Sequence, residues 1–356
     1  MPAARRTAAL LALVLAADGC TGERRGEPTP QTALVDTIDL DAAVGTDVVI
    51  YDLAASPTGT PVALVGADGA PQSWLVRLAL DDAGAATDLR AIPAVASTAQ
   101  LAVAPDGTVL VADDELTRVP PDAAEVSAVP WDLGGPPSAV ALSPDGRTLS
   151  AARDTTITAV DVATGAVRGS GTASGPVTHL AGTPDGGLAA LVTADRPAGG
   201  TGAVLVLLDR DLRPVGDPVE LVPERPSTGT ALHVTADGTA VAALHLGEAR
   251  AVGRLVTVVD GGLRTSVDLD GAGDSALDLA VAPDGRTAVV PLADLQFPAE
   301  LVTVDLTSGE RVGAVKLCDG AGVLGAVAPL GEGEGFVVTG ACIDADGPQS
   351  TAFVVG

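Results

Sequence analysis

Short apolar runs separated by turn-forming residues occupy most of the chain after residue 32. In one such stretch, residues 101–104 precede the phrase Ala-Pro-Asp-Gly, and a second apolar run at 109–112 follows it. These runs show no helical periodicity. Proline presets a turn, and Asp-Gly supplies the positive-φ positions of a tight hairpin. Each phrase therefore predicts a hairpin between two short β-strands.

The hairpin phrase recurs at a nearly regular interval. Five clear copies and two worn copies stand at 104–107, 143–146, 183–186, 235–238 and 282–285, and at 56–59 and 328–331. A third apolar run ends in a second turn phrase, as at 160–165 and 304–309, and a fourth run follows, as at 166–170 and 311–317. Four short strands in each repeat are typical of a propeller blade. We therefore predict an all-β fold, a seven-bladed β-propeller over residues 33–356.

The turn phrases resemble the WD40-like, YVTN-type repeats of bacterial surface propellers, and this resemblance covers residues 33–356. It implies a propeller fold outside the cytoplasm. Propellers of this general kind include lactonase-like enzymes, so the resemblance is also compatible with an enzymatic function. The basic and histidine channel residues of lactonases have no counterpart in the aligned positions of this chain, which are acidic or small.

The last repeat lacks a fourth strand. Apolar runs at 336–341 and 352–356 supply its second and third strands, and then the chain stops. We expect the N-terminal run at 34–40 to complete the last blade and remove an exposed edge. Its edge-filling side chains would be Leu34, Val35, Ile38 and Leu40. The alternative is a six-bladed ring with the first worn copy as an accessory hairpin.

The N-terminus has the pattern of an export signal. Arg5 and Arg6 precede an apolar stretch at 8–17, which is too short to span a bilayer. Residues 1–20 resemble a bacterial lipoprotein signal, with Cys20 as the lipid-modified residue, and the polar residues 21–32 predict a flexible tether. These residues imply a lipid anchor on the outer, extracytoplasmic side of the cell membrane. An ordinary secretory signal is the alternative.

Composition narrows the choice of partners. The chain has 46 acidic and 20 basic residues and a formal net charge of −26, which repels phosphate backbones. We expect a monomer that binds no nucleic acid, with the acidity serving solubility and cation binding as the alternative. Two cysteines remain beside the lipidated one, and because disulfides persist in exported proteins we expect Cys318 and Cys342 to form one.

Aligning the repeats on the turn phrase reveals candidate site residues. Three residues before its second position stands alanine in six repeats and His233 in the other. Five residues before it, four of seven residues are polar: Asp52, Gln100, His179 and Asp278. Both positions should face the central channel, because side chains two residues apart share one face of a strand. These polar side chains either face channel water or form a small-molecule or cation site at the channel mouth, with His233 below.

No catalytic motif accompanies these residues. The chain contains neither a Gly-x-Ser-x-Gly elbow nor a His-Glu-x-x-His zinc motif, and it lacks a phosphate-binding loop. We therefore predict a non-enzymatic, envelope-anchored module that binds a protein or peptide partner and carries no resident cofactor or metal. The alternatives are a propeller hydrolase or lactonase, and a small-ligand or divalent-cation protein that uses the channel mouth.

Overall fold

The computed structural model describes most of the chain after the N-terminus. The described residues are 33–55, 60–67, 69–78, 88–121, 126–131, 133–197, 199–247, 252–269, 275–294, 297–331, 335–344 and 347–356. Cys20, the tether at 21–32 and the worn phrase at 56–59 lie outside them. Thr32–Gly356 is one compact unit, and its secondary structure consists almost entirely of strands. Within the described ranges, no helix has the length and apolar character needed to cross a membrane.

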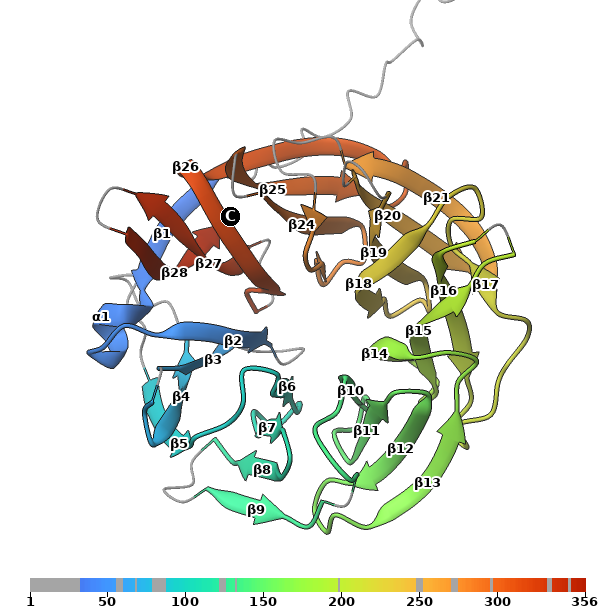
Figure 1. Ribbon diagram of the computed structural model, residues 1–356, viewed down its shortest axis with the longest axis horizontal. Coiled ribbons are helices and arrows are strands. Elements are labelled where there is room, and N and C mark those ends of the chain that lie inside the picture. Colours follow the sequence, from blue (N-terminus) through green and yellow to red (C-terminus); the bar gives the residue numbers. More distant parts are fainter. Residues whose placement is uncertain are drawn as a thin grey trace, which may run out of the picture. The chain divides into compact units, whose positions relative to one another are not determined.

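Five sheets of this unit have four antiparallel strands each, taken consecutively along the chain. Figure 1 shows them around a common centre, with the first strand of each sheet nearest to it. The first three sheets are β2 (Val49–Ala54), β3 (Val62–Gly66), β4 (Gln72–Arg77) and β5 (Asp88–Pro93); β6 (Gln100–Val103), β7 (Val109–Ala112), β8 (Leu116–Val119) and β9 (Ser127–Val129); and β10 (Ala139–Leu142), β11 (Thr148–Arg153), β12 (Thr156–Asp161) and β13 (Val167–Thr172). The next two are β14 (Val177–Gly182), β15 (Leu188–Asp195), β16 (Thr201–Leu208) and β17 (Val219–Glu220); and β18 (Ser227–Val234), β19 (Ala240–Leu246), β20 (Val252–Val259) and β21 (Gly262–Leu269).

A further sheet has eight strands, because the long strand β26 (Glu310–Pro329) has two different neighbours along its length. Its first part pairs with β25, and its second part, from Gly322, pairs with β27. The other strands are β22 (Ser275–Ala276), β23 (Ala280–Val281), β24 (Thr287–Asp294), β25 (Phe297–Asp305), β27 (Phe336–Asp344), β28 (Gly347–Val355) and β1 (Leu34–Asp39). Each part of β26 thus belongs to a group with the same four-strand pattern as the other sheets.

The five clear turn phrases adopt one hairpin geometry. In the first, Gly107 has φ +82° and donates its N–H to the carbonyl of Ala104 at 2.9 Å. The Oδ1 atom of Asp106 accepts the N–H of Thr108 at 2.9 Å. The same side-chain bond recurs in the other copies, from Asp145, Asp185, Asp237 and Asp284. The aspartate of the phrase therefore has a local structural role, and these bonds account for the recurrence of the sequence.

The N-terminal strand pairs with the last strand of the chain, β1 with β28, and Ile38 lies opposite Ala352. The expected strand at 34–40 is one residue too long, because Leu40 begins the short helix α1 (Leu40–Val44). Ile38 and Leu40 are 5% and 0% exposed, whereas Leu34 and Val35 are 40% and 65% exposed. A register shift between Leu34 and Asp36 leaves Val35 outside the pairing. The expectation that all four side chains fill the edge was therefore wrong for Leu34 and Val35.

Apolar side chains fill the space between neighbouring sheets. One cluster combines Leu191 and Leu205 of the β14–β17 sheet with Leu244 and Val256 of the β18–β21 sheet, each at most 1% exposed. A sheet that packs on both faces needs apolar side chains in both directions, which produces continuous runs in place of alternation. The runs of alanine, valine and leucine in the sequence follow from this arrangement.

Candidate binding site

Two of the polar inner-strand residues accept backbone N–H groups from other inner strands. Asp52 lies on β2, and its carboxylate accepts the N–H of Leu101 on β6 at 2.7 Å and that of Leu53 at 2.8 Å. Asp278 lies between β22 and β23, and its carboxylate accepts the N–H of Val327 on β26 at 2.7 Å. Each carboxylate thus satisfies backbone donors that would otherwise face the interior without a partner, which is costly.

Both of these carboxyl groups resist ionisation. Burial raises the pKa of Asp52 to about 6, although the hydrogen bonds from Leu101 and Leu53 act in the opposite direction. Burial also raises the pKa of Asp278 to about 7, and the nearby charge of Asp52 adds to this shift. The two groups are therefore close enough to repel each other. A carboxyl group that is partly protonated near neutral pH and already accepts backbone N–H groups is a poor cation ligand.

Gln100 and His179 do not join these carboxylates in a common polar cluster. Gln100 donates from Nε2 to the carbonyl of Thr98 at 3.4 Å. Burial lowers the pKa of His179 to about 4, and its Nδ1 atom is buried without a hydrogen-bond partner in the described part of the chain. Among the described residues, no group of three or more His, Cys, Asp or Glu side chains could hold a metal ion.

A pocket of about 740 Å³ lies at the end of the inner strands that carries the turn phrases. We call it the turn-end pocket. Its lining comes from β2, β18 and β26 and from the turns around 236 and 283, and its apolar surface includes Leu53, Leu279, Val281 and Val327. Of the five candidate residues, His233 lines this pocket and Asp52, Gln100, His179 and Asp278 do not.

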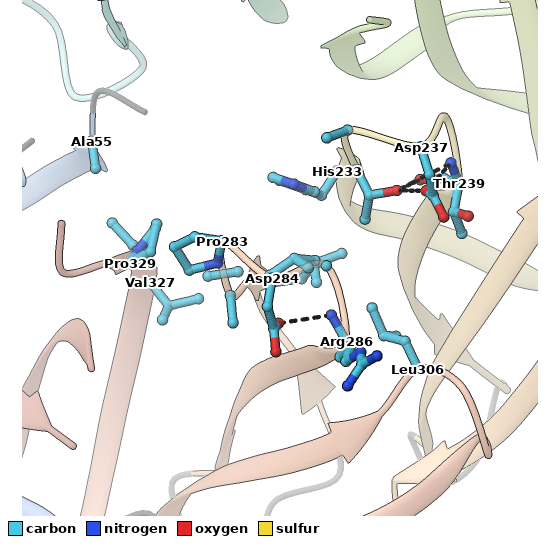
Figure 2. Close-up of a pocket in the computed structure, with 18 of the residues that line it drawn as sticks. Ala55, His233, Asp237, Thr239, Pro283, Asp284, Arg286, Leu306, Val327 and Pro329 are labelled. Atoms are coloured by element: carbon cyan, nitrogen blue, oxygen red, sulfur yellow. Dashed lines mark hydrogen bonds between the residues drawn. The ribbon is translucent and has the colours of Figure 1, made fainter. Parts of the chain in front are cut away.

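His233 is the residue that gives this pocket a distinct chemistry. Figure 2 shows its ring projecting from β18 toward the open space bounded by Ala55, Pro283 and Pro329. Burial lowers the pKa of His233 to about 4, so the imidazole is neutral at pH 7 and can both donate and accept a hydrogen bond. No described residue forms a hydrogen bond with it. The imidazole is thus available to a ligand.

Four charged side chains also line the turn-end pocket. Asp237 and Asp284 are held in their own turns, where they accept the N–H groups of Thr239 at 3.1 Å and Arg286 at 2.8 Å. The guanidinium groups of Arg264 on β21 and of Arg286 are exposed and have no ion-pair or hydrogen-bond partner among the described residues. The pocket therefore offers two guanidinium groups without a protein partner, whereas each of its carboxylates already accepts a backbone N–H through Oδ1.

Sequence reasoning identified His233 as an exception within the repeat but missed both arginines. A signal for Arg286 was present, because it directly follows the clear phrase at 282–285 and precedes a strand that leads away from the same turn. Arg264 has no comparable signal. Its place in the lining depends on how β21 packs beside the turn at 305–309, where the Thr265 side chain lies against Gly309.

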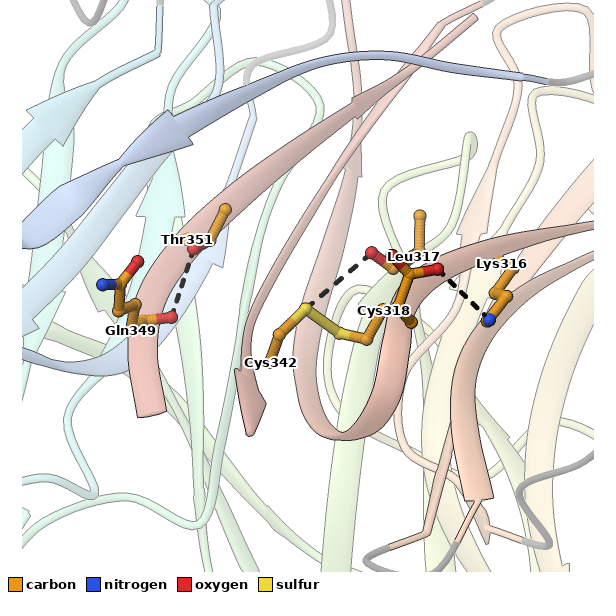
Figure 3. The surroundings of a disulfide bond; sticks show 7 residues. Lys316, Leu317, Cys318, Cys342, Gln349 and Thr351 are labelled. Carbon is orange, nitrogen blue, oxygen red and sulfur yellow. Dashed lines mark hydrogen bonds and ion pairs between the residues drawn. A yellow bond between two sulfur atoms is a disulfide. The ribbon is translucent and has the colours of Figure 1, made fainter. Parts of the chain in front are cut away.

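Cys318 and Cys342 form a disulfide between β26 and β27, with their Cα atoms 5.5 Å apart (Figure 3). Cys318 lies in the part of β26 that pairs with β25, at the register shift between Lys316 and Ala321, and Cys342 pairs with Gln349 on β28. The bond therefore joins the two groups of strands that share β26. It lies outside the lining of the turn-end pocket.

Comparisons with known proteins inform the fold alone. No protein-family model matches the sequence, and no curated protein matches it either. Among solved structures, a chain of Kuenenia stuttgartiensis hydrazine synthase superposes with a TM-score of 0.64 at 16% identity, over 85% of this chain and 94% of that chain. At this level of identity the likeness concerns the arrangement of sheets and carries no information on activity.

Proposed function

We propose that residues 33–356 form a seven-bladed β-propeller closed by their own N-terminal strand. Five blades are the four-stranded sheets, and the eight-stranded sheet supplies two more, divided within β26. Contacts between first strands support this count, since β2 contacts β6, β6 contacts β10, β10 contacts β14, β14 contacts β18, and β26 contacts β2. The six-bladed alternative is less favoured, because β2–β5 have the same four-stranded order as the other sheets.

In the same proposal, Cys20 carries a lipid that anchors the protein to the outer face of the cell membrane. Residues 21–32 connect this anchor to the propeller. The support is the sequence pattern alone: a basic start, a short apolar stretch and a cysteine at its end. A monomer with a net charge of −26 would then stand on the membrane surface without binding nucleic acid.

The propeller acts as a non-enzymatic binding module, with the turn-end pocket as its binding site. The observation that supports this proposal is that the polar inner-strand residues differ in whether the protein itself satisfies them. Asp52 and Asp278 are committed to backbone N–H groups of neighbouring strands, whereas His233 faces a pocket of about 740 Å³ without a protein partner. A hydrolase would need a nucleophile or an activated water next to a base, and the described pocket residues do not combine these.

Filling the pocket tests the proposal. Ala54 and Ala102 occupy the same repeat position and are both half-buried, but only Ala54 lines the turn-end pocket. We expect the parent and Ala102→Phe to capture the same molecule from the native envelope, and Ala54→Phe to lose it while melting normally. Equal capture by both variants would show that the pocket is not the binding site. Hydrolysis of lactone substrates by the parent, abolished in Asp278→Asn, would instead favour the enzyme alternative.

A further inference from the structure

We propose that the turn-end pocket binds a small aliphatic carboxylic acid, whose carboxylate lies at Arg264 and Arg286 and whose far end carries a second polar group at His233. This inference rests on the pocket being the binding site, and it adds the chemical class of the ligand. Three features of the pocket support it: the two arginines without a protein partner, the apolar side chains in the lining, and the position of the His233 imidazole.

The two arginines of the pocket indicate that one end of the ligand is an anion. Both guanidinium groups line the pocket and have no partner among the described residues, although the chain as a whole is strongly acidic. Elsewhere on the described surface several arginines have ion-pair partners: Arg168 pairs with Asp161, Arg254 pairs with Asp268 at 2.6 Å, and Arg196 pairs with Glu220 at 3.3 Å. Two unpaired planar donors at one pocket complement a carboxylate.

Arg264 and Arg286 belong to elements on either side of one turn. The carbonyl of Arg286 accepts the N–H of Leu306 at 2.7 Å, which fixes Arg286 against the start of the turn at 305–309. Thr265, next to Arg264, lies against Gly309 at the end of the same turn. Both arginines therefore belong to elements that meet this turn, whose Leu306 and Thr307 also line the pocket, and we place the carboxylate of the ligand on this side.

The position of His233 indicates that the far end of the ligand carries a second polar group. Figure 2 shows Arg286 beside Leu306, whereas the His233 ring projects toward the open space on the side of Ala55 and Pro329, so the two side chains would meet different ends of an elongated ligand. The lining of the same pocket also includes apolar side chains, among them Val281 of β23 and Leu279 just before it. An aliphatic chain covers this surface favourably. The neutral imidazole then forms a hydrogen bond with a hydroxyl or carbonyl group at the far end of the ligand.

The repeat itself indicates that His233 is not needed for folding. The six other repeats have alanine at this position, including Ala54, Ala102 and Ala280. The His233 side chain is half-buried, and its ring nitrogens have no partner among the described residues, so they are left to water or to a ligand in the pocket. His233→Ala restores the common residue of the repeat and is therefore a conservative test variant.

The experiment measures binding of aliphatic acids to the purified full-length protein in detergent by titration calorimetry. The probes are ω-hydroxy aliphatic acids of increasing chain length, the parent acids without the hydroxyl, and the matched amides. We expect an optimal chain length, a loss of affinity of roughly tenfold or more for the amide, and a gain of several-fold from the hydroxyl. His233→Ala should abolish the hydroxyl gain and leave the difference between acid and amide intact.

Arginine variants provide the matched control. Arg286 and Arg147 both follow a Pro-Asp-Gly turn, but Arg147 is outside the turn-end pocket. Arg286→Gln should weaken acid binding by roughly tenfold, and Arg147→Gln should leave it unchanged. Equal weakening by both variants, or amides that bind as well as acids, would overturn the carboxylate assignment. If Ala54→Phe nevertheless blocks capture of the natural ligand, the binding function stands and only the ligand class is wrong.

Discussion

The pairing of β1 with β28 makes the stability of the last group of strands depend on one buried side chain near the start of the unit. Ile38 is 5% exposed and belongs to a cluster with Leu53, Ala352 and Val354, whereas Val35 on the same strand is 65% exposed. Truncating a buried isoleucine to alanine costs about 2–5 kcal/mol, because a cavity remains where the side chain was. We therefore expect Ile38→Ala to lower the free energy of unfolding by that amount, and Val35→Ala to change it by less than about 0.5 kcal/mol.

Deleting residues 33–40 is the stronger form of the same perturbation. It removes two buried aliphatic side chains, Ile38 and Leu40, worth roughly 1.5–3 kcal/mol each, and leaves β28 as an open edge. The resulting loss of about 3–6 kcal/mol is comparable to the whole stability of many domains, about 5–15 kcal/mol. Deleting residues 21–31 removes a similar length of chain with the composition of a linker, and it should leave the unfolding transition unchanged.

Urea unfolding followed by circular dichroism gives the four free energies. Amide hydrogen exchange locates the effect, because weakened pairing should raise exchange in β28 before it does so in β14–β17. If Ile38→Ala and Val35→Ala unfold alike, the burial argument for β1 fails. If the two deletions both unfold like the parent, the N-terminal strand does not close the ring, and the six-bladed alternative gains.

Three further results are expected. Because burial raises the pKa of Asp52 to about 6, folding favours its protonated form, and the stability it adds is fully present below about pH 4 and lost as the pH rises through 6. Through Asp52, the unfolding free energy of the parent should fall by about 1.4 kcal/mol between roughly pH 5 and 8, and Asp52→Asn should lack this part of the fall. A variant whose unfolding free energy falls as much as that of the parent would refute the assignment. Reducing the Cys318–Cys342 bond, which spans 24 residues, should cost about 3 kcal/mol, and the oxidised protein should show neither thiol reactive under denaturing conditions. Cys20→Ser should release the protein from the membrane fraction; retention would contradict the lipid anchor.

The hairpins could be predicted because each is specified within a few residues. In the phrase at 104–107, the glycine adopts positive φ and the aspartate binds an N–H two residues ahead, so sequence and geometry coincide locally. The pairing of β1 with β28 was also predictable, since the last repeat visibly lacks a strand. Helix α1 was not. It begins with an Asp39 cap, whose side chain accepts the N–H of Ala42 at 2.9 Å, in a segment whose apolar residues suit a strand equally well.

The candidate site could be predicted only in part, because its residues acquire their roles from partners far away in the sequence. Asp52 and Leu101 are 49 residues apart, and so are Asp278 and Val327. No spacing rule within one repeat reveals that a carboxylate will accept an N–H from the inner strand of the next repeat. The arginines of the turn-end pocket raise the same difficulty, since Arg264 reaches it by the packing of β21 beside a neighbouring turn.

Comparing equivalent positions of the repeats distinguishes residues that the fold requires from residues that have another role. A position that is alanine in most repeats tolerates alanine in that structural setting, so a polar residue there needs a separate reason. For Asp52, at its own position in the repeat, the reason is visible in the bond to Leu101. For His233 no described side chain or backbone group supplies one, while the ring faces a pocket with two unpaired guanidinium groups. The imidazole is therefore left to water or to a ligand in the pocket, and because it has no partner within the fold, His233, and not the carboxylates, is the residue on which the binding proposal depends.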